Sequence, residues 1–480
     1  MLKTIIYKCL GMASVALFFL ACTPSIVGKK VNKTVPLNYN NSQDSTNSAK
    51  VQWKDFFTDP YLNVLIDTAL RNNQELNITL QEIIIARNEV RFRKGEYLPF
   101  VNLYAGAGVD RVGRYTRQGS LEANSNNQIE PGKEFPNYLP DYIVAANVSW
   151  QVDIWHKLRN AKKAAVSRYL ASVEGRNFMV TRLVAEIANS YYELLALDNQ
   201  LEIIKQNIDI QSNALEIVRL QKIAARVTEL AVRRFEAQVL NTRSLQFKIQ
   251  QRIIETENRI NFLTGRYPQP ISRDFKNFSS LVHNTIQAGI PSQLLQNRPD
   301  IRQAEFNMTA ANLDVKSAKA NFYPSLNISA AIGLESFNAT YLLKTPQSML
   351  FSLFGGLTAP LINRNAIKAT YYSANARQIQ TVYNYQRTIL NAYIEVANQL
   401  SNISNLEKSY DLKAKQVEAL TESIEISNGL FRSARADYME VLLTQRDALE
   451  SKFELIETKR QQMNAMVNIY QALGGGWNYR

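Results

Sequence analysis

The chain of 480 residues is poor in the side chains that build disulfides and metal sites. It has two cysteines, two histidines and eight methionines. Both cysteines, Cys9 and Cys22, lie near the N-terminus, so the rest of the chain has no thiol for a disulfide. His156 and His283 are far apart in sequence, whereas a histidine metal site needs partner ligands. Sparse methionine offers no thioether stripe for copper or silver, so the composition gives no support for a resident metal.

Catalytic and nucleotide-binding motifs are absent as well. The sequence contains no HExxH, CxxC, GxSxG or GxxxxGKS/T motif. The glycine run 474–476 follows a helical segment, where glycine is typical of a helix terminator rather than a phosphate loop. No catalytic constellation is therefore predicted.

The charge balance is basic, with a formal net charge of +13. A basic chain can bind nucleic acid. Here, however, charges of both signs alternate along the predicted helices, which is typical of solvated helix faces, so we expect no nucleic-acid partner. Hydrophobic residues make up 46% of the chain and mean hydropathy is −0.24, which argues against a helical membrane protein.

The N-terminus has the pattern of a secretory signal. Lys3 and Lys8 precede an apolar run over residues 10–21, which is shorter than the ~20 residues of a spanning helix. The sequence Phe19-Leu-Ala-Cys22 resembles a bacterial lipobox, with Phe19 in place of the usual leucine. We expect removal of residues 1–21 and lipidation of Cys22. The alternative is a free cysteine beside an ordinary cleavage site.

The second half of the chain repeats the first. Residues 94–108 (KGEYLPFVNLYAGAG) correspond to 319–333 (KANFYPSLNISAAIG), and INFLTG at 260–265 corresponds to IYQALG at 469–474. In each copy, a helical run ends at an aromatic-proline step and an alternating strand follows. In the first copy we expect this helical run to begin at Asp59-Pro60 and to continue without a break to about Lys94. A repeat of this length predicts a pseudo-symmetric assembly rather than an ordinary globular core.

Four alternating runs predict two β-hairpins whose strands have one apolar and one small, polar face. Each run is about the ~10 residues that a membrane-spanning strand needs. Four strands cannot close a barrel, and open edges are not tolerated in lipid. Either three chains pool twelve strands, or each sheet is soluble with one wet face, and alternation alone does not decide.

The segments between the hairpins predict very long helices with seven-residue apolar tracks. One track in the second copy holds Leu442, Leu449, Ile456, Met463 and Tyr470. The matching track in the first copy holds Leu240, Phe247 and Ile254. A second track runs beside each, which indicates left-handed winding with neighbours on two sides. That favours a closed ring of helices over a plain antiparallel coiled coil.

Several stretches of the sequence resemble those of a known protein family. They are the opening helix from Trp53 to Asn73, PSQLLQNRPDIRQAE and AKANFYPSLNISAAIG within 290–333, ADYMEVLLTQR at 436–446 and LGGGW at 473–477. With them the chain resembles TolC-type outer-membrane efflux proteins of the lipoprotein branch, often called the NodT family. The resemblance covers nearly all of the chain after the signal.

The resemblance implies a mainly α fold with a β-barrel portion. It implies a homotrimer with a 12-strand outer-membrane barrel, four strands per chain, continuous with a 12-helix periplasmic tunnel. It implies no enzyme and no cofactor. The function would be a passive exit duct, lipid-anchored in the outer membrane and extending into the periplasm, with a periplasmic adaptor and an inner-membrane RND-type pump as partners. The alternative is a lipid-anchored periplasmic coiled-coil adaptor or scaffold.

On this reading the chain has six segments: a signal peptide (1–21), a lipidated tether (22–52), a first repeat (53–265), an equatorial linker (266–298), a second repeat (299–474) and a C-terminal tail (475–480). Each repeat has a helix, a hairpin (about 98–154 or 325–361) and long helices (157–264 or 366–473). We expect the lumen to be lined by Asn147, Ser149, Asn327 and Ser329. We expect lipid to meet Val148, Trp150, Leu326 and Ile328.

The periplasmic gate is expected at two helix-to-helix turns, near Ala225 and Ala434, where family members often have glycine. By the family motif, Glu440 falls where acidic residues ring the closed aperture in some members, so three copies would favour cations. Leu443 occupies the second acidic position and is expected to form an apolar constriction.

A further pair is predicted at the gate. Arg435 and Asp437 would pair across helices and hold it shut. The plain alternative for Glu440 is a solvated helix charge.

Overall fold

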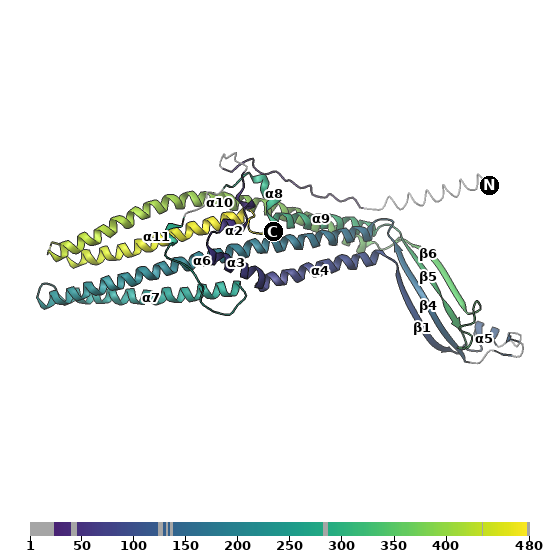
Figure 1. The fold of residues 1–480 in the computed structure, drawn as a ribbon. Coiled ribbons are helices and arrows are strands. Elements are labelled where there is room, and N and C mark those ends of the chain that lie inside the picture. Colours follow the sequence, from purple (N-terminus) through teal and green to yellow (C-terminus); the bar gives the residue numbers. More distant parts are fainter. Residues whose placement is uncertain are drawn as a thin grey trace. The chain divides into compact units, whose positions relative to one another are not determined.

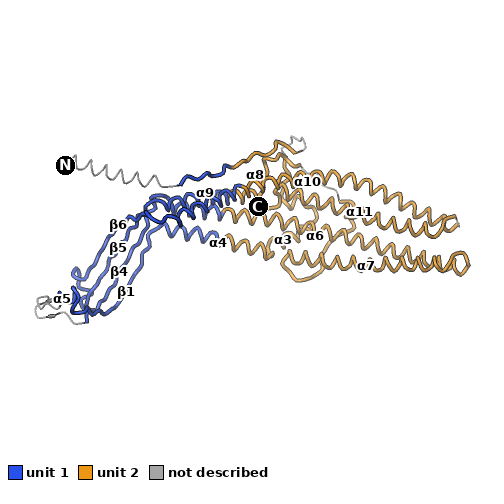
Figure 2. Tube along the Cα trace, turned by 180° about the vertical axis from the view of Figure 1, so that it is seen from behind, with its two compact units in different colours: residues 1–30, 85–169, 307–382 blue, residues 31–84, 170–306, 383–480 orange. Residues whose placement is uncertain are grey.

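The computed structural model describes residues 24–39, 46–122, 128–130, 133–134, 138–281, 287–433 and 435–477. The chain divides into two compact units, drawn in different colours in Figure 2. The first comprises residues 1–30, 85–169 and 307–382, and the second comprises residues 31–84, 170–306 and 383–480. The predicted lipidation at Cys22, the turn residue Ala434 and His283 lie outside the described residues.

The first unit contains a four-stranded antiparallel sheet (Figure 1). Its order is β1-β4-β5-β6, with bounds β1 Phe100–Asp110, β4 Leu139–Val152, β5 Ser325–Ser336 and β6 Met349–Thr358. The four strands per chain are thus confirmed. The connection between β1 and β4 carries α5 (Arg117–Glu122) and a small ribbon of β2 (Gln128–Glu130) and β3 (Lys133–Glu134).

Helices make up most of the rest of the chain. The long ones are α4 (Gln74–Tyr97), α6 (Lys157–Ile223), α7 (Glu229–Leu263), α9 (Pro299–Ala320), α10 (Asn365–Arg432) and α11 (Tyr438–Ala472). The shorter ones are η1 (Ser48–Lys50), α2 (Trp53–Phe56), α3 (Pro60–Asn72), η2 (Phe278–Ser280), η3 (Pro291–Gln293) and α8 (Leu294–Asn297). Among the described helices, none combines the length and hydrophobicity needed to cross a membrane.

The opening helix differs from the sequence interpretation, which ran it unbroken from Pro60 to about Lys94. It breaks at Asn73, which has extended backbone (ψ 126°) between α3 and α4. The Asn73 side-chain oxygen accepts a hydrogen bond from the Leu76 backbone amide at 2.9 Å, and so caps α4. It also donates to the Leu263 carbonyl at 2.9 Å. Asparagine therefore ends one helix, starts the next and ties the break to α7.

The second repeat has the same joint with different chemistry. Arg298 precedes α9 and donates to the Ala472 carbonyl of α11 at 2.8 Å. Ala472 stands two residues before Gly474, as Leu263 stands two before Gly265. Both glycines have positive φ, 69° and 91°. An added Cβ on either would meet the backbone of the joint at under 3 Å, so glycine lets each long helix end against its joint.

The apolar tracks of α7 and α11 are matched in sequence but not in burial. Leu240 is 60% exposed and its equivalent Leu449 is 8% exposed. Phe247 is 68% exposed against 7% for Ile456, and Ile254 is 51% against 8% for Met463. The expectation of neighbours on two sides therefore holds for α11 within the chain. On α7 this track has no cover from the described residues of its own chain.

Within the predicted tether, the described residues 24–39 form no helix or strand, yet they make buried contacts. Tyr39 is buried and stacks on Tyr393 with ring centroids 5.4 Å apart. Lys33 forms an ion pair with Glu305 at 2.7 Å. Aromatic stacking and this pair attach residues 31–39 to the second unit.

Candidate functional site: the sheet faces, the strand–helix junction and the helix tips

The register of the sheet sorts its side chains into two faces. Val148 lies opposite Val101 and Ala330, and Ser149 lies opposite Phe100 and Ser329. Directly opposed residues share a face of a sheet, and neighbours along a strand do not. The polar set Asn147, Ser149, Asn327 and Ser329 therefore shares one face. The apolar set Val148, Trp150, Leu326 and Ile328 shares the other.

The face that contains Val148 is apolar and open along its length. Its exposed large side chains are Val101, Leu103, Val109, Val144, Ile332, Met349, Phe351, Leu353 and Leu357. A contiguous exposed apolar surface of this kind is a signature of contact with lipid or with a partner. The opposite face carries the asparagines and serines together with Gly333 and Gly356.

The two edges of the sheet are unpaired in the described chain. Strands β1 and β6 each pair on one side only, because the sheet order begins with β1 and ends with β6. An edge strand leaves backbone donors and acceptors open, which is costly in lipid. A chain with this sheet needs additional strands before the apolar face can lie in a membrane.

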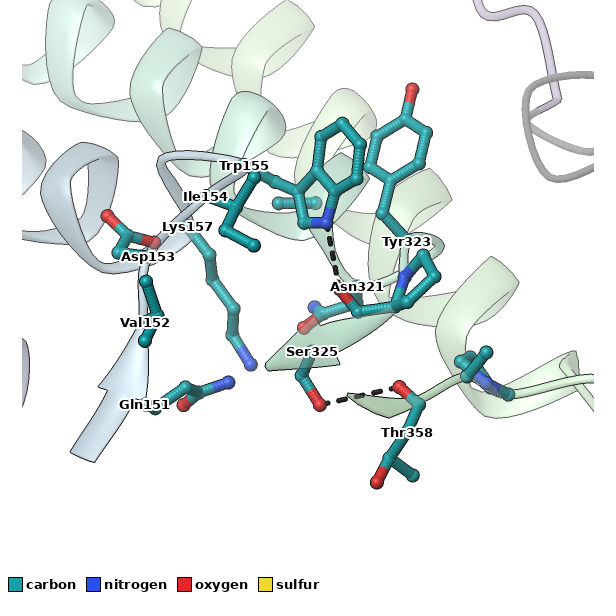
Figure 3. Close-up of a pocket in the computed structure, with 14 residues that line it drawn as sticks. Gln151, Val152, Asp153, Ile154, Trp155, Lys157, Asn321, Tyr323, Ser325 and Thr358 are labelled. Carbon is teal, nitrogen blue, oxygen red and sulfur yellow. Dashed lines mark hydrogen bonds between the residues drawn. The ribbon is translucent and has the colours of Figure 1, made fainter. Parts of the chain in front are cut away.

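The junction between β4 and α6 is a capped turn. Both carboxylate oxygens of Asp153 accept helix amides, from Leu158 and Arg159, each at 2.9 Å. His156 has φ 59°, so it supplies the turn between strand and helix, and its ring nitrogen Nε2 lies 3.4 Å from Nη1 of Arg159. Trp155 donates to the Pro324 carbonyl at 2.8 Å and stacks on Tyr323 (Figure 3).

The turn between α6 and α7 contains Ala225 in the left-handed region, with φ 53°. The Arg226 amide donates to the Gln221 carbonyl and the Ala225 amide to the Lys222 carbonyl, both at 2.9 Å. This is the hydrogen-bond pattern of a glycine-type helix cap, formed here by alanine. The Ala-for-Gly difference thus leaves the expected turn geometry in place at this tip.

Charges at the first tip are paired with one another. Lys222 and Arg233 both bind Glu229, and Arg233 also reaches Glu236 at 2.9 Å. The hydrogen bond from Lys222 is the main cause that lowers the pKa of Glu229, and the charge of Arg233 acts in the same direction. The first turn is therefore closed by its own ion pairs.

The second tip is different. Asp437 precedes α11 without capping it by its side chain, and Glu440 lies in the first turn of that helix. Within the described part of the chain, no ion pair involves Arg435, Asp437 or Glu440. The predicted Arg435–Asp437 pair does not form within one chain, and a pair with a neighbouring chain stays a prediction.

Glu440 and Leu443 face the same shallow groove. They line it with residues of α10, including Ile426 and Leu430, and both side chains are exposed. The structure therefore brings the two proposed gate residues together on one surface. Their role in a gate remains a prediction.

Arg298 lies in the NRPD sequence that contributed to the resemblance, but no role was predicted for it. It is buried, binds Asp300 through two nitrogens and binds Glu395 at 2.7 Å. Burial alone would lower its pKa, but the hydrogen bonds and charges of these carboxylates outweigh burial and raise the pKa. Arg298 thus fixes the joint between α8, α9, α10 and α11.

Comparison with known proteins identifies the family to which the chain belongs. The family model described as outer membrane efflux protein matches residues 65–266 and 290–475. The chain belongs to the outer membrane efflux protein family. It is similar to the pyoverdine export outer membrane protein OpmQ of Pseudomonas aeruginosa, with 26% identity over 98% of this chain and 97% of OpmQ. It is equally similar to the cation efflux system protein CusC of Escherichia coli O6:H1, with 26% identity over 96% and 97%.

The solved structures agree on the fold. The open state of the MtrE outer membrane channel of Neisseria gonorrhoeae superposes with a TM-score of 0.80, covers 95% of this chain and 99% of MtrE, and is 23% identical. The TolC-type recognition and the fold class are confirmed. This family member is an outer-membrane efflux channel protein that extends into the periplasm. The family consists of channels rather than enzymes.

Proposed function

We propose that three copies of this chain form one passive exit duct. The observation that carries the proposal is the sheet: an apolar face exposed along its length, bounded by two unpaired edge strands. If β6 of one copy pairs with β1 of the next, three sheets close a barrel of twelve strands and satisfy every edge. The apolar set then meets lipid, and the polar set wets the lumen.

The helices support the same stoichiometry. The exposed track of Leu240, Phe247 and Ile254 on α7 is suited to pack against a helix of a neighbouring copy. Four long-helix segments per chain, from α6, α7, α10 and α11, give a ring of twelve in a trimer. Packing between copies would bury the apolar track on α7, as contacts within the chain already bury the matched track on α11.

A duct of this kind has no energy source of its own. We propose that it receives cargo from an inner-membrane RND-type pump through a periplasmic adaptor. OpmQ and CusC are named for pyoverdine and for cations, so relatives at equal distance are named for different cargo. Neither cargo is transferred to this chain.

We further propose that the tips form the periplasmic gate. The unpaired charges at the second tip are available to neighbouring chains, whereas Lys222, Glu229 and Arg233 at the first tip are engaged with one another. Three copies of Glu440 would place a ring of negative potential at the aperture, with Leu443 as an apolar constriction beside it.

The test is conductance of the purified protein in a planar lipid bilayer, with its mass in detergent measured in parallel. We expect a trimer and discrete current steps that favour cations. In cells, deletion of the gene is expected to increase sensitivity to toxic compounds. A protein that stays monomeric and never inserts would refute the duct and favour a periplasmic coiled-coil role.

A further inference from the structure

A polar cavity lies where the strands of the first unit end. It is bordered by the last residues of β4 and β6, the start of β5 and the start of α6. Gln151, Ser325 and Thr358, which line it, belong by register to the same sheet face as Asn327 and Ser329. The cavity therefore opens on the polar face of the sheet.

Lys157 supplies the cation of this cavity. Figure 3 shows its side chain reaching into the cavity, with the amine directed toward Gln151 and Ser325. Asp153, the acid that borders the cavity, has both oxygens engaged by helix amides. In the described part of the chain, no hydrogen bond or ion pair involves the Lys157 amine.

The other polar groups reinforce a preference for anions. The carboxamides of Gln151 and Asn321 line the cavity and have N–H donors without partners among the described residues. The Ser325 hydroxyl is directed to the Thr358 carbonyl at 3.5 Å. A lysine with two amide donors, beside an acid whose oxygens are both bound by helix amides, is suited to an oxyanion.

The size of the cavity limits what enters it. Its free volume is about 240 Å³. Pockets for drug-sized ligands are larger, roughly 300–1,000 Å³. A single charged group fits, and the rest of a cargo molecule would remain outside. The stacked pair of Trp155 and Tyr323 holds the wall in place, with ring centroids 4.8 Å apart.

We propose that Lys157 and its cavity form a binding site for the carboxylate, sulfonate or phosphate group of an anionic cargo in the lumen. The proposal rests on the proposed function in one respect, because the polar face of the sheet must line the lumen. Three copies would place three such sites at the level where strands give way to helices. The duct would then hold organic anions briefly on their way out.

The test is binding of pyrenetetrasulfonate, a flat anion that stays in water, to the protein in neutral maltoside micelles. Probe anisotropy reports binding without any need for conduction. We expect Lys157→Gln to raise the dissociation constant by about three- to tenfold, as loss of a charge-assisted contact predicts. Lys157→Arg should keep most of the affinity. The matched control is Lys163→Gln, an exposed lysine six residues further along α6, which should leave binding unchanged.

The outcomes separate this inference from the proposed function. Equal loss with Lys157→Gln and Lys163→Gln, or no loss with either, would overturn the site whether or not the protein conducts. Quenching of tryptophan fluorescence by the probe should decrease in Trp155→Phe if the probe sits in the cavity. Repeating the titration in phosphatidylcholine nanodiscs with and without phosphatidylglycerol identifies the source of the anion. Loss of binding on addition of phosphatidylglycerol would place a lipid phosphate at Lys157 and overturn the lumenal assignment.

Discussion

The two repeats of this chain share a sequence pattern, but the matched apolar tracks on α7 and α11 differ in burial. The track on α11 is buried, because Ile456, Met463 and Tyr470 belong to the same core as Trp53 and Phe57 near the N-terminus. The matched track on α7 stays open. The N-terminal segment thus covers the track on α11, where Phe56 stacks on Tyr470, and the matched track on α7 is left for a partner.

The joints show the same asymmetry. Asn73 makes two hydrogen bonds at the first joint, as cap and as donor to Leu263. Arg298 at the second joint donates hydrogen bonds to Asp300, to Glu395 and to a helix carbonyl. A duplicated fold therefore keeps the position of a contact while its chemistry changes from an amide to a buried charge.

The largest expected effect is at the second joint. Arg298→Ala would leave a helix carbonyl and two carboxylates without their buried partner, and should destabilise the fold by about 3–5 kcal/mol. Asn73→Ala, the matched change at the first joint, should cost about 1–3 kcal/mol. Urea unfolding of the purified protein followed by circular dichroism measures both. Equal losses would show that the two joints are energetically alike.

The tracks offer the next test. Ile456→Ala should lower protomer stability by about 2–5 kcal/mol, because it removes a buried side chain. Phe247→Ala, at the matched position, should change protomer stability by under about 1 kcal/mol, since its side chain is exposed in the single chain. It should instead weaken the trimer.

Unfolding curves combined with mass measurement on dilution separate these two effects. Phe247→Asp is the stronger version and should yield monomers with native helix content. A stable Phe247→Asp trimer would show that α7 does not face a neighbouring copy.

The second tip carries charged side chains that form no ion pair within the described chain, so removal of a charge there should alter the ion preference of the channel. Glu440→Gln is expected to reduce the cation preference of single channels, because each trimer loses three negative charges at the aperture. Reversal potentials in a salt gradient measure the preference. Glu418→Gln, an exposed helix charge on α10, is the control and should have little effect. Equal effects of the two changes would make Glu440 an ordinary solvated charge.

The first tip should respond to backbone chemistry. Ala225→Gly removes the penalty of a left-handed alanine and should stabilise the turn by about 1 kcal/mol. Ala214→Gly, within α6, should have the opposite sign, because glycine weakens a helix interior by about 0.5–1 kcal/mol. Hydrogen exchange of the amides around residue 225 reports both. A loosened turn in Ala225→Gly would contradict the cap geometry.

The smallest effect is the pH response of the same turn. The pKa of Glu229 is lowered in the folded protein, so its contribution is present above the ordinary glutamate pKa of 4.5 and is lost as pH falls through the folded value. The protection of the amides at the first tip, corrected for the intrinsic pH dependence of exchange, should therefore decrease below about pH 4.5, and Glu229→Gln should remove that dependence. Unchanged acid sensitivity in Glu229→Gln would assign the response to another group.

Much of the fold was predictable because it rests on local periodicity. Alternation located the strands and placed Asn327 and Ile328 on opposite faces, and the seven-residue apolar tracks indicated the long helices. The break at Asn73 was missed because apolar spacing continues across it, although an asparagine followed by a helical run is a capping signal.

What the sequence could not show depends on contacts between distant segments. The cavity at Lys157 forms only when residues near 151, 323 and 358 meet. The exposure of Phe247 depends on which apolar track the N-terminal helices cover, because Phe56 and Phe57 pack on Tyr470 of α11. The buried role of Arg298 likewise requires Glu395, almost a hundred residues away, and no spacing rule in one sequence reports such a pair.

The most direct test of the central claim uses two adjacent residues of β5 that the register places on opposite faces. Asn327→Cys and Ile328→Cys are inserted separately into planar bilayers and treated with a bulky, water-soluble thiosulfonate reagent, with the untreated variants and the treated wild type as controls. If the polar face lines the lumen, modification lowers the single-channel conductance of Asn327→Cys and leaves that of Ile328→Cys unchanged. The reverse pattern, or equal modification of both, would contradict the assignment of the polar face to the lumen.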